Sequence, residues 1–512
     1  MRFLNKLKIV FYTITIMLSV LIFFSGCKKF LDRQPSARYT TDNYPYPEGG
    51  GPYDQFVYAA YSALRDYFVT SYAYIGAVSI RSDDADKGSS LFDGDGYGLI
   101  QADNFPVRVD ALFGNELWKG YYSSLIYKCN VVLKQVALDT TGTPEATKTL
   151  ARAEARFMRG YAYFTMVRLF GNIPLIDTVL DVSQSNVAQS TPAEIYAFIE
   201  KDLQYAAANL PLTWDAKYIG RSTSGAANGL LAKVYLYEKK WSDAMATAGI
   251  VINSGVYDLK TPYDKIFTDA GENSSESVFE IQCYADANHP TEYGCQYADI
   301  QGVRGVASQD LGWGFNNPSH QLHIAYEPGD PRMNSTILFV PTPLPTRYGE
   351  TFGRPEPNDS MYNMKVYTDP ATRAKVGGLD GQHGWWVNIR MLRYSDVVLI
   401  YAEAANELGQ TSEALQKIEW VRARARNGNS SILPPVTTTD QALIRLAIQH
   451  ERRVEFGMEH ERFFDLVRWG IAADAMHAAG KFNFLAGRDE LLPIPQAQID
   501  LSKGVLHQNP GY

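Results

Sequence analysis

The stretch "LIYAEAANELGQTSEALQKIEWVR" (Leu399–Arg422) decides the fold of this chain. It predicts a helix, a short polar turn and a second helix. Ala402 and Ala414, 12 positions apart, put one small residue on each helix. An earlier stretch, "GLLAKVYLYEKKWSDAMATAGIVI" (Gly229–Ile252), has two alanines at the same spacing. Both stretches therefore predict a pair of helices that approach each other closely at their small residues.

Two such pairs in one helix-rich chain indicate the tetratricopeptide geometry, in which small residues lie where paired helices meet. The full repeat signature is absent, so ordinary helical hairpins with alanine at the crossing remain the alternative. A helical block from about Tyr53 to Leu210 precedes the first pair. Within it, Gly171 and Pro174 are expected to end one long helix, and Pro192 is expected to begin the next. We therefore predict a mainly α fold built on tetratricopeptide-like helix pairs.

The region from Tyr257 to Asn388 differs from the helical parts on either side. Glycine, proline, asparagine and aromatic residues dominate it, and helical periodicity disappears. Short apolar runs, "SVFEIQ", "STILFVP" and "YNMKVY", predict small strands that hold it in place. A loop region of this length inside a folded domain is usually functional, so we expect these loops and strands to face a ligand.

The densest cluster of charge is "ERRVEFGMEHERFFDLVRWG" (Glu451–Gly470), which mixes acids and arginines with phenylalanines. Gly457 is expected to divide it into two helices. Such a cluster could be an acid/base active site or a set of ion pairs that ties helices together. Each acid lies within one helical turn of an arginine, which favours its ionised form and disfavours a general acid of raised pKa. We therefore favour the structural interpretation.

We predict that these late charges pair with a basic stripe on the long helix of the first block, and so hold the C-terminal helices against it. This predicted set is called the ion-pair brace. Its members are Arg152, Arg156, Arg159, Glu451, Glu455, Asp465 and Arg468.

The N-terminus predicts export and lipid attachment. A basic start precedes the apolar residues Ile9–Phe24, which as a helix would span roughly 24 Å, less than the ~30 Å hydrocarbon core of a bilayer. This is typical of a signal peptide rather than of a membrane-spanning helix. The sequence "FFSGC" then matches a bacterial lipobox, so we expect residues 1–26 to be removed and Cys27 to carry acyl chains such as palmitate. The alternative is an incidental thiol behind an ordinary cleavage site. Residues 27–52, rich in proline and glycine, are predicted to be a tether.

Composition and motifs argue against several other functions. A net charge of −8 disfavours binding to nucleic acid. No C-x-x-C spacing indicates a zinc site, and whether Cys283 and Cys295 pair is left open. The run "DGDGYG" resembles a calcium loop only weakly, so we predict no metal and no cofactor. No H-E-x-x-H, G-x-S-x-G or phosphate-loop pattern occurs, which argues against an enzyme.

Several blocks resemble the SusD/RagB family, the surface glycan-binding lipoproteins of Bacteroidetes. In order, they are "CKKFLDRQP" after the lipobox, "RAEARFMRGYAYFTMVRLFGNIPL" (Arg152–Leu175), "LRYSDVVLIYAEAANELG" (Leu392–Gly409), the charged stretch above and "LLPIPQAQIDLSKGVLHQNPGY" (Leu491–Tyr512). Together these blocks span nearly the whole chain after the lipobox.

The resemblance implies a single domain over residues 53–512, built on about four tetratricopeptide-like helix pairs. Its expected parts are an N-terminal part (53–256), the loop-rich insert (257–388) and the C-terminal helices with a tail (389–512). The resemblance also implies a non-enzymatic protein that is anchored to the outer membrane through acylated Cys27 and faces the cell exterior.

The partners implied by the resemblance are a glycan and a SusC-like TonB-dependent transporter. Such a protein would bind oligosaccharide or polysaccharide and act as a movable lid over the transporter. The alternative is a SusD-like lipoprotein that captures peptides or serves only as a scaffold of the uptake complex. A surface hydrolase is a third, less favoured possibility.

The family's ligand residues are not fixed in sequence, so the site candidates come from this chain's own residues. A sugar site needs flat aromatic faces and polar side chains that bond hydroxyl groups. Two segments combine them, "SIRSDDADKGSSLFDGDGYG" and "TEYGCQYADIQ…DLGWGFNN". The candidates are Trp313, Phe315, Tyr293, Tyr297, Tyr97, Arg81 and Asp83. Trp313 is favoured because its flanking glycines are expected to leave the ring exposed. The alternative for each is that it packs its own loop.

Overall fold

The structure is a computed structural model that describes residues 51–512 except 306–308, 344 and 354–358. Residues Tyr53–Tyr512 form one compact unit. The signal peptide, Cys27 and nearly all of the tether lie outside the described residues, so these expectations stay predictions. None of the described helices is long and apolar enough to cross a membrane.

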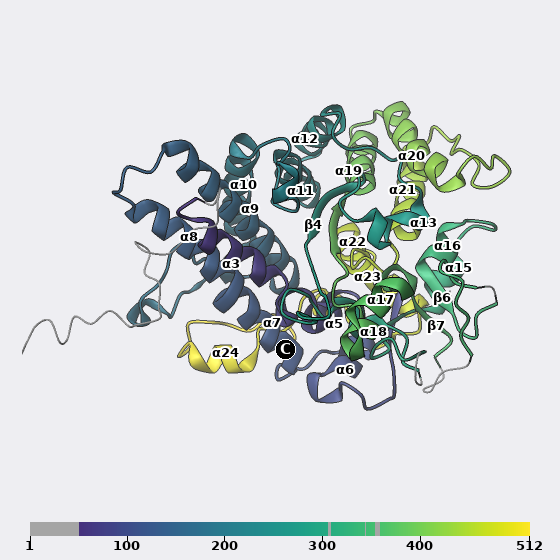
Figure 1. The fold of residues 1–512 in the computed structure, drawn as a ribbon, viewed down its shortest axis with the longest axis horizontal. Helices are drawn as coiled ribbons and strands as arrows, with labels where there is room; N and C mark the ends of the chain where they lie inside the picture. The colour runs from purple at the N-terminus through teal and green to yellow at the C-terminus, as the bar shows by residue number, and fades with distance from the viewer. Residues whose placement is uncertain (1–50, 306–308, 344, 354–358) are drawn as a thin grey trace, which may run out of the picture. The chain divides into compact units, whose positions relative to one another are not determined.

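Helices pack on helices through most of this unit (Figure 1). The longer helices are α3 (Asp54–Leu64), α8 (Tyr127–Leu138), α9 (Glu145–Phe170), α10 (Pro192–Asn209), α11 (Ser224–Tyr237), α12 (Trp241–Asn253), α19 (Tyr394–Glu407), α20 (Thr411–Arg426) and α21 (Gln441–Phe456). Taken two at a time along the chain, the first eight of these helices pack side by side as α3 with α8, α9 with α10, α11 with α12, and α19 with α20. The predicted mainly α fold is confirmed.

The two sequence stretches that predicted helix pairs are α11–α12 and α19–α20. Their alanines, Ala232, Ala244, Ala402 and Ala414, are all completely buried, because a small side chain allows the backbones to approach. Helix α12 also packs on α19, and α10 packs on α11. The pairs therefore form one continuous series rather than separate hairpins.

Helix ends follow the local sequence. Gly171, with φ +70°, ends α9 and donates its N–H to the carbonyl of Val167. Pro192 begins α10 behind a capping box formed by Thr191 and Glu194. Gly457 ends α21, and the chain then enters α22 (Arg462–Trp469), so the predicted break in the charged stretch is confirmed.

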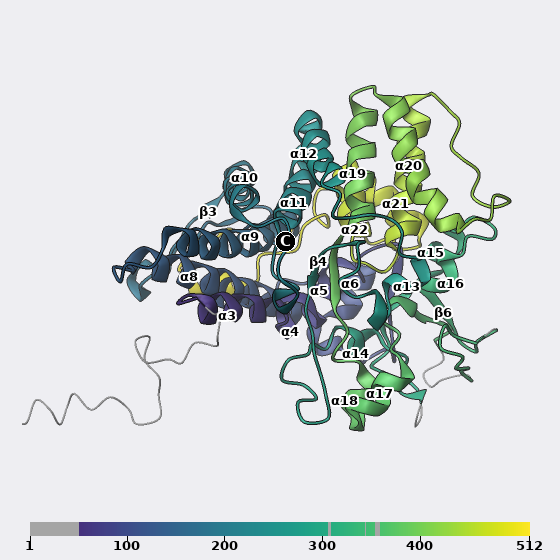
Figure 2. The same ribbon diagram turned by 45° about the horizontal axis from the view of Figure 1, so that its top comes forward.

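The insert contains small antiparallel sheets and short helices (green in Figure 2). The strand pairs in the described chain are β1 (Ala85–Gly88) with β5 (Phe315–Pro318), β2 (Ile173–Pro174) with β3 (Gln189–Ser190), β4 (Ser277–Ile281) with β8 (Ile389–Arg393), and β6 (Ile337–Phe339) with β7 (Met361–Asn363). Strands β4 and β6 lie within the first two predicted apolar runs, whereas β7 covers only the start of the third run, which continues as a 3-10 helix, η7 (Met364–Val366). Two of the pairs, β1–β5 and β4–β8, attach the insert to the chain before and after it.

Short helices were not predicted in the insert. They are α13 (Tyr263–Ile266), α14 (Tyr297–Gln301), α15 (His320–Ala325), α16 (Arg332–Thr336), α17 (Pro370–Val376) and α18 (Gly378–His383). Each is two turns or less, which is too short to produce a periodic apolar pattern in the sequence.

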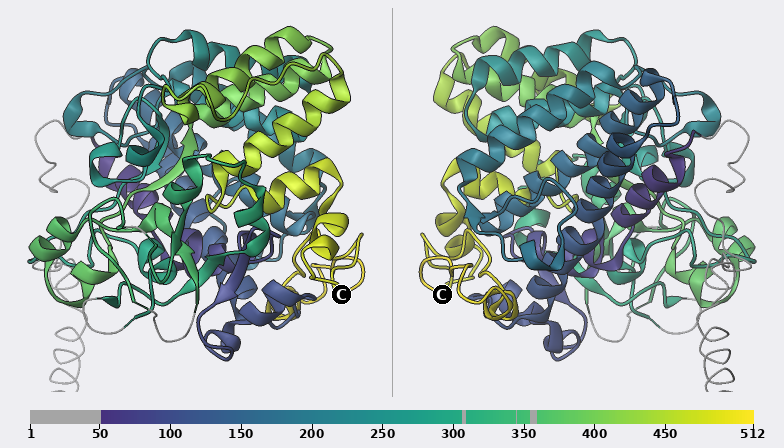
Figure 3. Two further views of the ribbon diagram at one scale, coloured as in Figure 1. Left: turned by 90° about the vertical axis from the view of Figure 1, so that its right-hand side faces the viewer. Right: turned by 90° about the vertical axis from the view of Figure 1, so that its left-hand side faces the viewer.

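Short elements also follow α3 and complete the C-terminal part. They are α4 (Tyr67–Thr70), α5 (Tyr72–Val78), η1 (Asp95–Tyr97), α6 (Leu99–Asn104), α7 (Leu112–Lys119), η2 (Gly120–Ile126), α23 (Ala472–Ala478) and α24 (Gln496–Leu501). The C-terminal tail returns to the N-terminal part (Figure 3), where Leu492 N–H donates to the carbonyl of Leu169 in α9 at 2.7 Å and Gln496 N–H donates to the carbonyl of Val109 before α7 at 3.0 Å.

The late acids form buried ion pairs with arginines. Arg393 Nη1 lies 2.8 Å from Glu455 Oε1, and Arg424 Nη2 lies 2.5 Å from the same oxygen. Arg332 Nη1 bridges to Glu455 Oε2 at 3.2 Å and to Glu451 Oε1 at 2.6 Å. Helix α21 is thereby joined to α16, to the end of β8 and to α20.

Two further ion pairs extend this network to α22. Arg452 Nε lies 2.8 Å from Asp465 Oδ2, and Arg468 Nε lies 2.8 Å from Asp465 Oδ1. Arg468 also contacts Glu403 of α19 at 2.5 Å. The C-terminal helices are therefore connected to one another by charge pairs that are nearly free of solvent.

The predicted partners of the basic stripe are wrong. Arg159 Nε lies 2.8 Å from Asp202 Oδ2 of α10, and Arg156 Nε lies 3.8 Å from Asp202 Oδ1. Arg152 Nη1 pairs with Glu145 of its own helix at 2.5 Å. The spacing of the three arginines correctly placed them along α9. It could not show that α10 packs against α9 and supplies Asp202, because that depends on the tertiary structure.

A catalytic role for the late acids is not compatible with their surroundings. The side chains of Glu451 and Glu455 are completely buried. Burial raises the pKa of Glu455, but Arg424, Arg393 and Arg332 outweigh this effect and hold its pKa well below the usual range. Glu455 is therefore an ionised partner of three arginines, out of reach of a dissolved substrate.

We expect Glu455→Ala to lower the free energy of unfolding by about 3–5 kcal/mol, because it leaves buried guanidinium groups without their counter-charge. Urea unfolding followed by circular dichroism measures this change. The matched control is Glu145→Ala, since the Glu145 side chain is 70% exposed, its pair with Arg152 is screened by solvent, and its removal should change the free energy of unfolding far less. Equal, small effects of both substitutions would contradict the structural role of Glu455.

Candidate functional site

Five aromatic rings from separate parts of the chain meet around Tyr72. The ring centroid of Tyr72 lies 5.7 Å from that of Tyr67, 4.9 Å from Tyr97, 6.2 Å from Trp313 and 5.6 Å from Phe315. These five residues are called the aromatic patch. They come from α4, α5, η1, the loop before β5, and β5 itself.

The rings of the patch differ in exposure. Tyr72 and Phe315 are buried, whereas Tyr67, Tyr97 and Trp313 are half-buried. Tyr72 and Phe315 therefore form the buried part of the patch, on the interior side of the other three rings. The half-exposed rings are the ones that a ligand on this surface can contact.

Three sequence candidates, Tyr97, Trp313 and Phe315, are brought together in this patch. Tyr67 and Tyr72 were missed, although "DYFVTSY" contains both. Aromatic residues in a helical block are more often core residues, and nothing in this run distinguishes a surface ring from a buried one.

Backbone geometry, rather than exposure, explains the glycines around Trp313. The Trp313 N–H donates to the carbonyl of Asp299 at 2.8 Å. A Cβ at Gly312 would lie 2.2 Å from that same oxygen, and Gly314 has φ +75°. Both positions therefore require glycine, and the Trp313 ring is held on a tightly turned backbone instead of extending freely into solvent.

Polar groups border the patch beside Tyr67. His383 Nδ1 lies 2.9 Å from Asp299 Oδ1, and this hydrogen bond raises the pKa of His383. Burial raises the pKa of Tyr67, and the nearby Tyr97 and Asp299 raise it further. Asp299 itself is buried, so the partly exposed polar groups at this edge are the His383 imidazole and the tyrosine hydroxyls.

A second polar edge connects the loop around Asp93 with the loop before Trp313. Arg304 forms an ion pair with Asp93, and its Nη1 donates to the Ser89 hydroxyl at 2.5 Å. Both partners of the ion pair remain about one third exposed. Hydrogen-bonding groups thus lie on two sides of the half-exposed rings.

A surface loop, 283–295, carries two exposed tyrosines next to this region. Tyr293 is 45% exposed and Tyr284 is 54% exposed. The Tyr284 N–H donates to the Tyr293 carbonyl at 2.9 Å, and Arg65 donates to the same carbonyl. Since Arg65 is only two residues before Tyr67, the loop lies near the aromatic patch.

Arg81 is a correction to the sequence-based candidates. Its side chain is completely buried, and its Nη2 donates to the Asp489 carbonyl at 2.6 Å. Its guanidinium carbon also lies 4.3 Å from the ring centroid of Phe463. Arg81 therefore holds the C-terminal tail and does not face a surface ligand.

Asp83 and Tyr297 are further corrections. Asp83 is buried, and Arg462 Nε lies 2.8 Å from its Oδ1. Tyr297 is also buried, and its hydroxyl lies 2.8 Å from Nε2 of His460. Both residues have polar partners inside the protein, a property that their loop-like sequence context did not reveal.

The described residues contain no group of three or more His, Cys, Asp or Glu side chains placed to hold a metal ion. The aromatic patch itself supplies rings for stacking, and its edges supply hydrogen-bonding groups.

Comparison with known proteins gives two family matches. Residues 349–512 match the model described as SusD family, and residues 97–236 match the model described as starch-binding associating with outer membrane. The SusD-like protein P2 of Formosa agariphila is 30% identical over 430 residues, covering 80% of this chain and 83% of the relative. A SusD-like protein of Bacteroides ovatus is 29% identical over 495 residues, covering 92% and 83%.

Solved structures agree with these matches. A laminarin-binding SusD-like protein superposes with a TM-score of 0.74 at 27% identity, covering 92% of this chain and all of that one. Surface glycan-binding protein A from Bacteroides fluxus superposes with a TM-score of 0.75 at 26% identity, covering 91% and 100%.

We expect Cys283 and Cys295 to form a disulfide under mild oxidation by molecular oxygen. Their Sγ atoms lie 3.1 Å apart, and the hydrogen bond from Cys283 lowers the pKa of Cys295, which favours the nucleophilic thiolate. Peptide mapping after alkylation of the unfolded protein detects the bond.

Cys129 is the internal control, because it is completely buried in α8 and should remain a thiol. Alkylation of both Cys283 and Cys295 after oxidation would contradict the pairing.

Proposed function

Because the chain belongs to the SusD family, we propose that it is a glycan-binding lipoprotein of the cell surface that delivers its ligand to a SusC-like TonB-dependent transporter. It is not an enzyme, since this is a family of non-catalytic glycan-binding proteins. In this proposal the protein is attached to the outer membrane through acylated Cys27 and acts as the lid of the transporter.

One observation carries the glycan-binding part of the proposal. Tyr67, Tyr97 and Trp313 are three partly exposed rings around Tyr72, and the partly exposed side chains of His383, Arg304 and Asp93 supply polar groups in the neighbouring loops. A flat ring can cover the C–H face of a sugar, while neighbouring polar groups bond its hydroxyls. The same arrangement has little to offer a long apolar or strongly charged ligand.

The relatives support the choice of ligand class. A structure of 27% identity is described as laminarin binding, and another of 26% identity as a surface glycan-binding protein. Laminarin, a neutral glucan, is therefore the first glycan to test. An affinity in the micromolar to millimolar range, about −4 to −8 kcal/mol, is expected because each sugar hydroxyl must first leave water.

We expect Trp313→Ala to weaken laminarin binding by roughly tenfold, which corresponds to about 1.4 kcal/mol. The loss of one stacking surface is of this size. Isothermal titration calorimetry with purified protein measures the affinity, and thermal unfolding shows whether the fold is retained.

The matched control is Trp420→Ala, which removes a 37% exposed tryptophan from α20, away from the patch. Unchanged affinity of Trp313→Ala would remove this residue from the site. If the unaltered protein bound peptides but no neutral glycan, the peptide-capturing alternative would replace the proposal.

We expect Cys27→Ser to release the protein from the membrane fraction into the soluble fraction, because the thiol that accepts the acyl chains is gone. Fractionation of expressing cells followed by immunoblotting measures the distribution. Ser25→Thr alters the same segment but leaves the thiol, and should remain membrane-bound. Membrane retention of Cys27→Ser would contradict lipid anchoring.

A further inference from the structure

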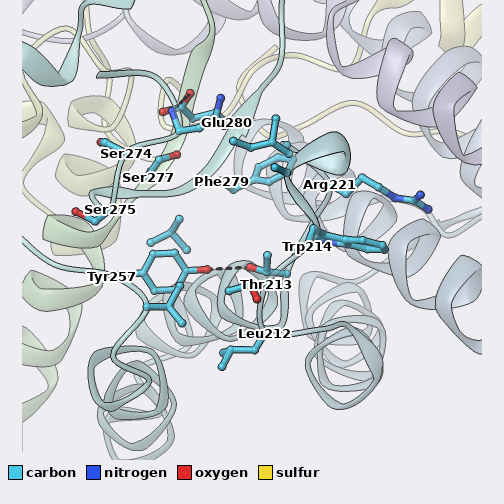
Figure 4. A pocket seen from close by; sticks show the side chains of 17 residues that line it. Leu212, Thr213, Trp214, Arg221, Tyr257, Ser274, Ser275, Ser277, Phe279 and Glu280 are labelled. Atoms are coloured by element: carbon cyan, nitrogen blue, oxygen red, sulfur yellow. Dashed lines mark hydrogen bonds between the residues drawn. The ribbon is translucent and has the colours of Figure 1, made fainter. Parts of the chain in front are cut away.

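A cavity of about 390 Å³ lies beside the start of β4, separate from the aromatic patch (Figure 4). Three parts of the chain line it: the segment after α10, the residues after α12, and residues 273–280, which lead into β4 and include most of it. The side chains on which the argument depends are Thr213, Trp214, Tyr257, Ser274, Ser277 and Phe279. No residue of the aromatic patch lines this cavity.

Aromatic rings surround part of the cavity. Figure 4 shows Trp214 and Tyr257 on opposite sides, with Phe279 on a third side. The indole N–H of Trp214 donates to the Ser222 carbonyl at 2.8 Å, and the Tyr257 hydroxyl lies 2.9 Å from the Thr223 hydroxyl. The two rings are therefore held in place before a ligand arrives, so binding does not have to order them.

The polar groups of the lining are mostly uncharged. Ser274, Ser275, Ser277 and Asn273 contribute hydroxyl and amide groups. The Ser274 hydroxyl oxygen is buried and has no hydrogen-bond partner among the described residues. Thr213, which is exposed, adds a further hydroxyl group to the lining, so the cavity offers uncharged hydrogen-bonding groups to a ligand.

Arg221, a cation that lines the cavity, is already paired. Its Nη2 lies 2.5 Å from Glu154 Oε1 and 3.2 Å from Asp54 Oδ1. Its positive charge is therefore balanced by two carboxylates, and among the described residues that line the cavity there is no other lysine or arginine to bind a phosphate or carboxylate ligand.

Glu280, an anion that lines the cavity, is engaged as well. It accepts a hydrogen bond from the Asn388 amide at 3.0 Å, and Arg390 Nε lies 3.6 Å from its Oε1. Both charges are matched by partners, and the other polar side chains on which the argument depends, Thr213 and Ser277, are neutral. This lining favours a neutral, polyhydroxylated ligand over an acidic or basic one.

We propose that this cavity is a second saccharide site, which takes the end of a neutral oligosaccharide. Its volume lies in the range of small-ligand sites, about 300–1,000 Å³, and exposed Leu212 and Thr213 line its rim. The ligand class rests on the proposed glycan-binding function. A glycan that reached both the cavity and the aromatic patch would be held more tightly than by either alone.

Saturation-transfer NMR with laminaribiose, cellobiose and maltose tests the second site. The experiment uses Trp313→Ala protein, so that the patch contributes less to the signal. We expect transfer to persist in this variant and to fall by roughly fivefold or more when Thr213→Trp is added. Thr213 is exposed, so the larger ring can block the cavity without disturbing the core.

The matched control is Lys201→Trp, which adds the same ring at an exposed position of α10 that does not line the cavity. Equal transfer in Thr213→Trp and Lys201→Trp, or loss of all disaccharide binding in Trp313→Ala alone, would overturn the second site while laminarin binding by the unaltered protein still stood. Failure of the unaltered protein to bind laminarin or any of the disaccharides would instead overturn the glycan-binding function itself.

Discussion

The buried ion pairs of Arg332, Arg393, Glu451 and Glu455 are the interaction on which the rest of the structure depends. All four side chains are at most 1% exposed, so their charges have been removed from water. Such a group is favourable only while each charge keeps its partners, because an unpaired buried charge is strongly destabilising. The four residues belong to α16, the end of β8 and α21. The network therefore makes the position of the insert and that of the helices mutually dependent.

This dependence determines where the aromatic patch can form. Trp313 and Phe315 belong to the insert, whereas Tyr67, Tyr72 and Tyr97 belong to the N-terminal part. The β1–β5 pair holds these parts together near the patch, and β4–β8 attaches the insert to α19. A patch assembled from two parts of the chain is preorganised only while both are held in place. Preorganisation matters here because sugar binding offers little net free energy to order a loose surface.

The sequence predicted the kind of site, aromatic rings with polar neighbours, more accurately than it predicted which residues form it. Trp313, Phe315 and Tyr97 do lie together around Tyr72, although Phe315 is buried. Arg81 and Asp83 looked equally suitable, but they are buried and bonded to the C-terminal part, hundreds of residues later in the chain. Whether a polar side chain faces a ligand or a distant partner depends on long-range contacts, which a local run of residues does not encode.

The sequence by itself determined the helix pairs, their ends and the family. These features can be predicted from the local sequence, because small residues at fixed spacing, capping residues and glycines act on nearby backbone atoms. Only the tertiary structure decided which charges pair: Arg159 meets Asp202, and Glu455 meets Arg393. It also decided which rings remain half-exposed and where a cavity opens beside β4. These features depend on which elements pack face to face. An arginine could pair with many different acids, and a ring could be buried against many different elements, so residue type alone does not select the partner.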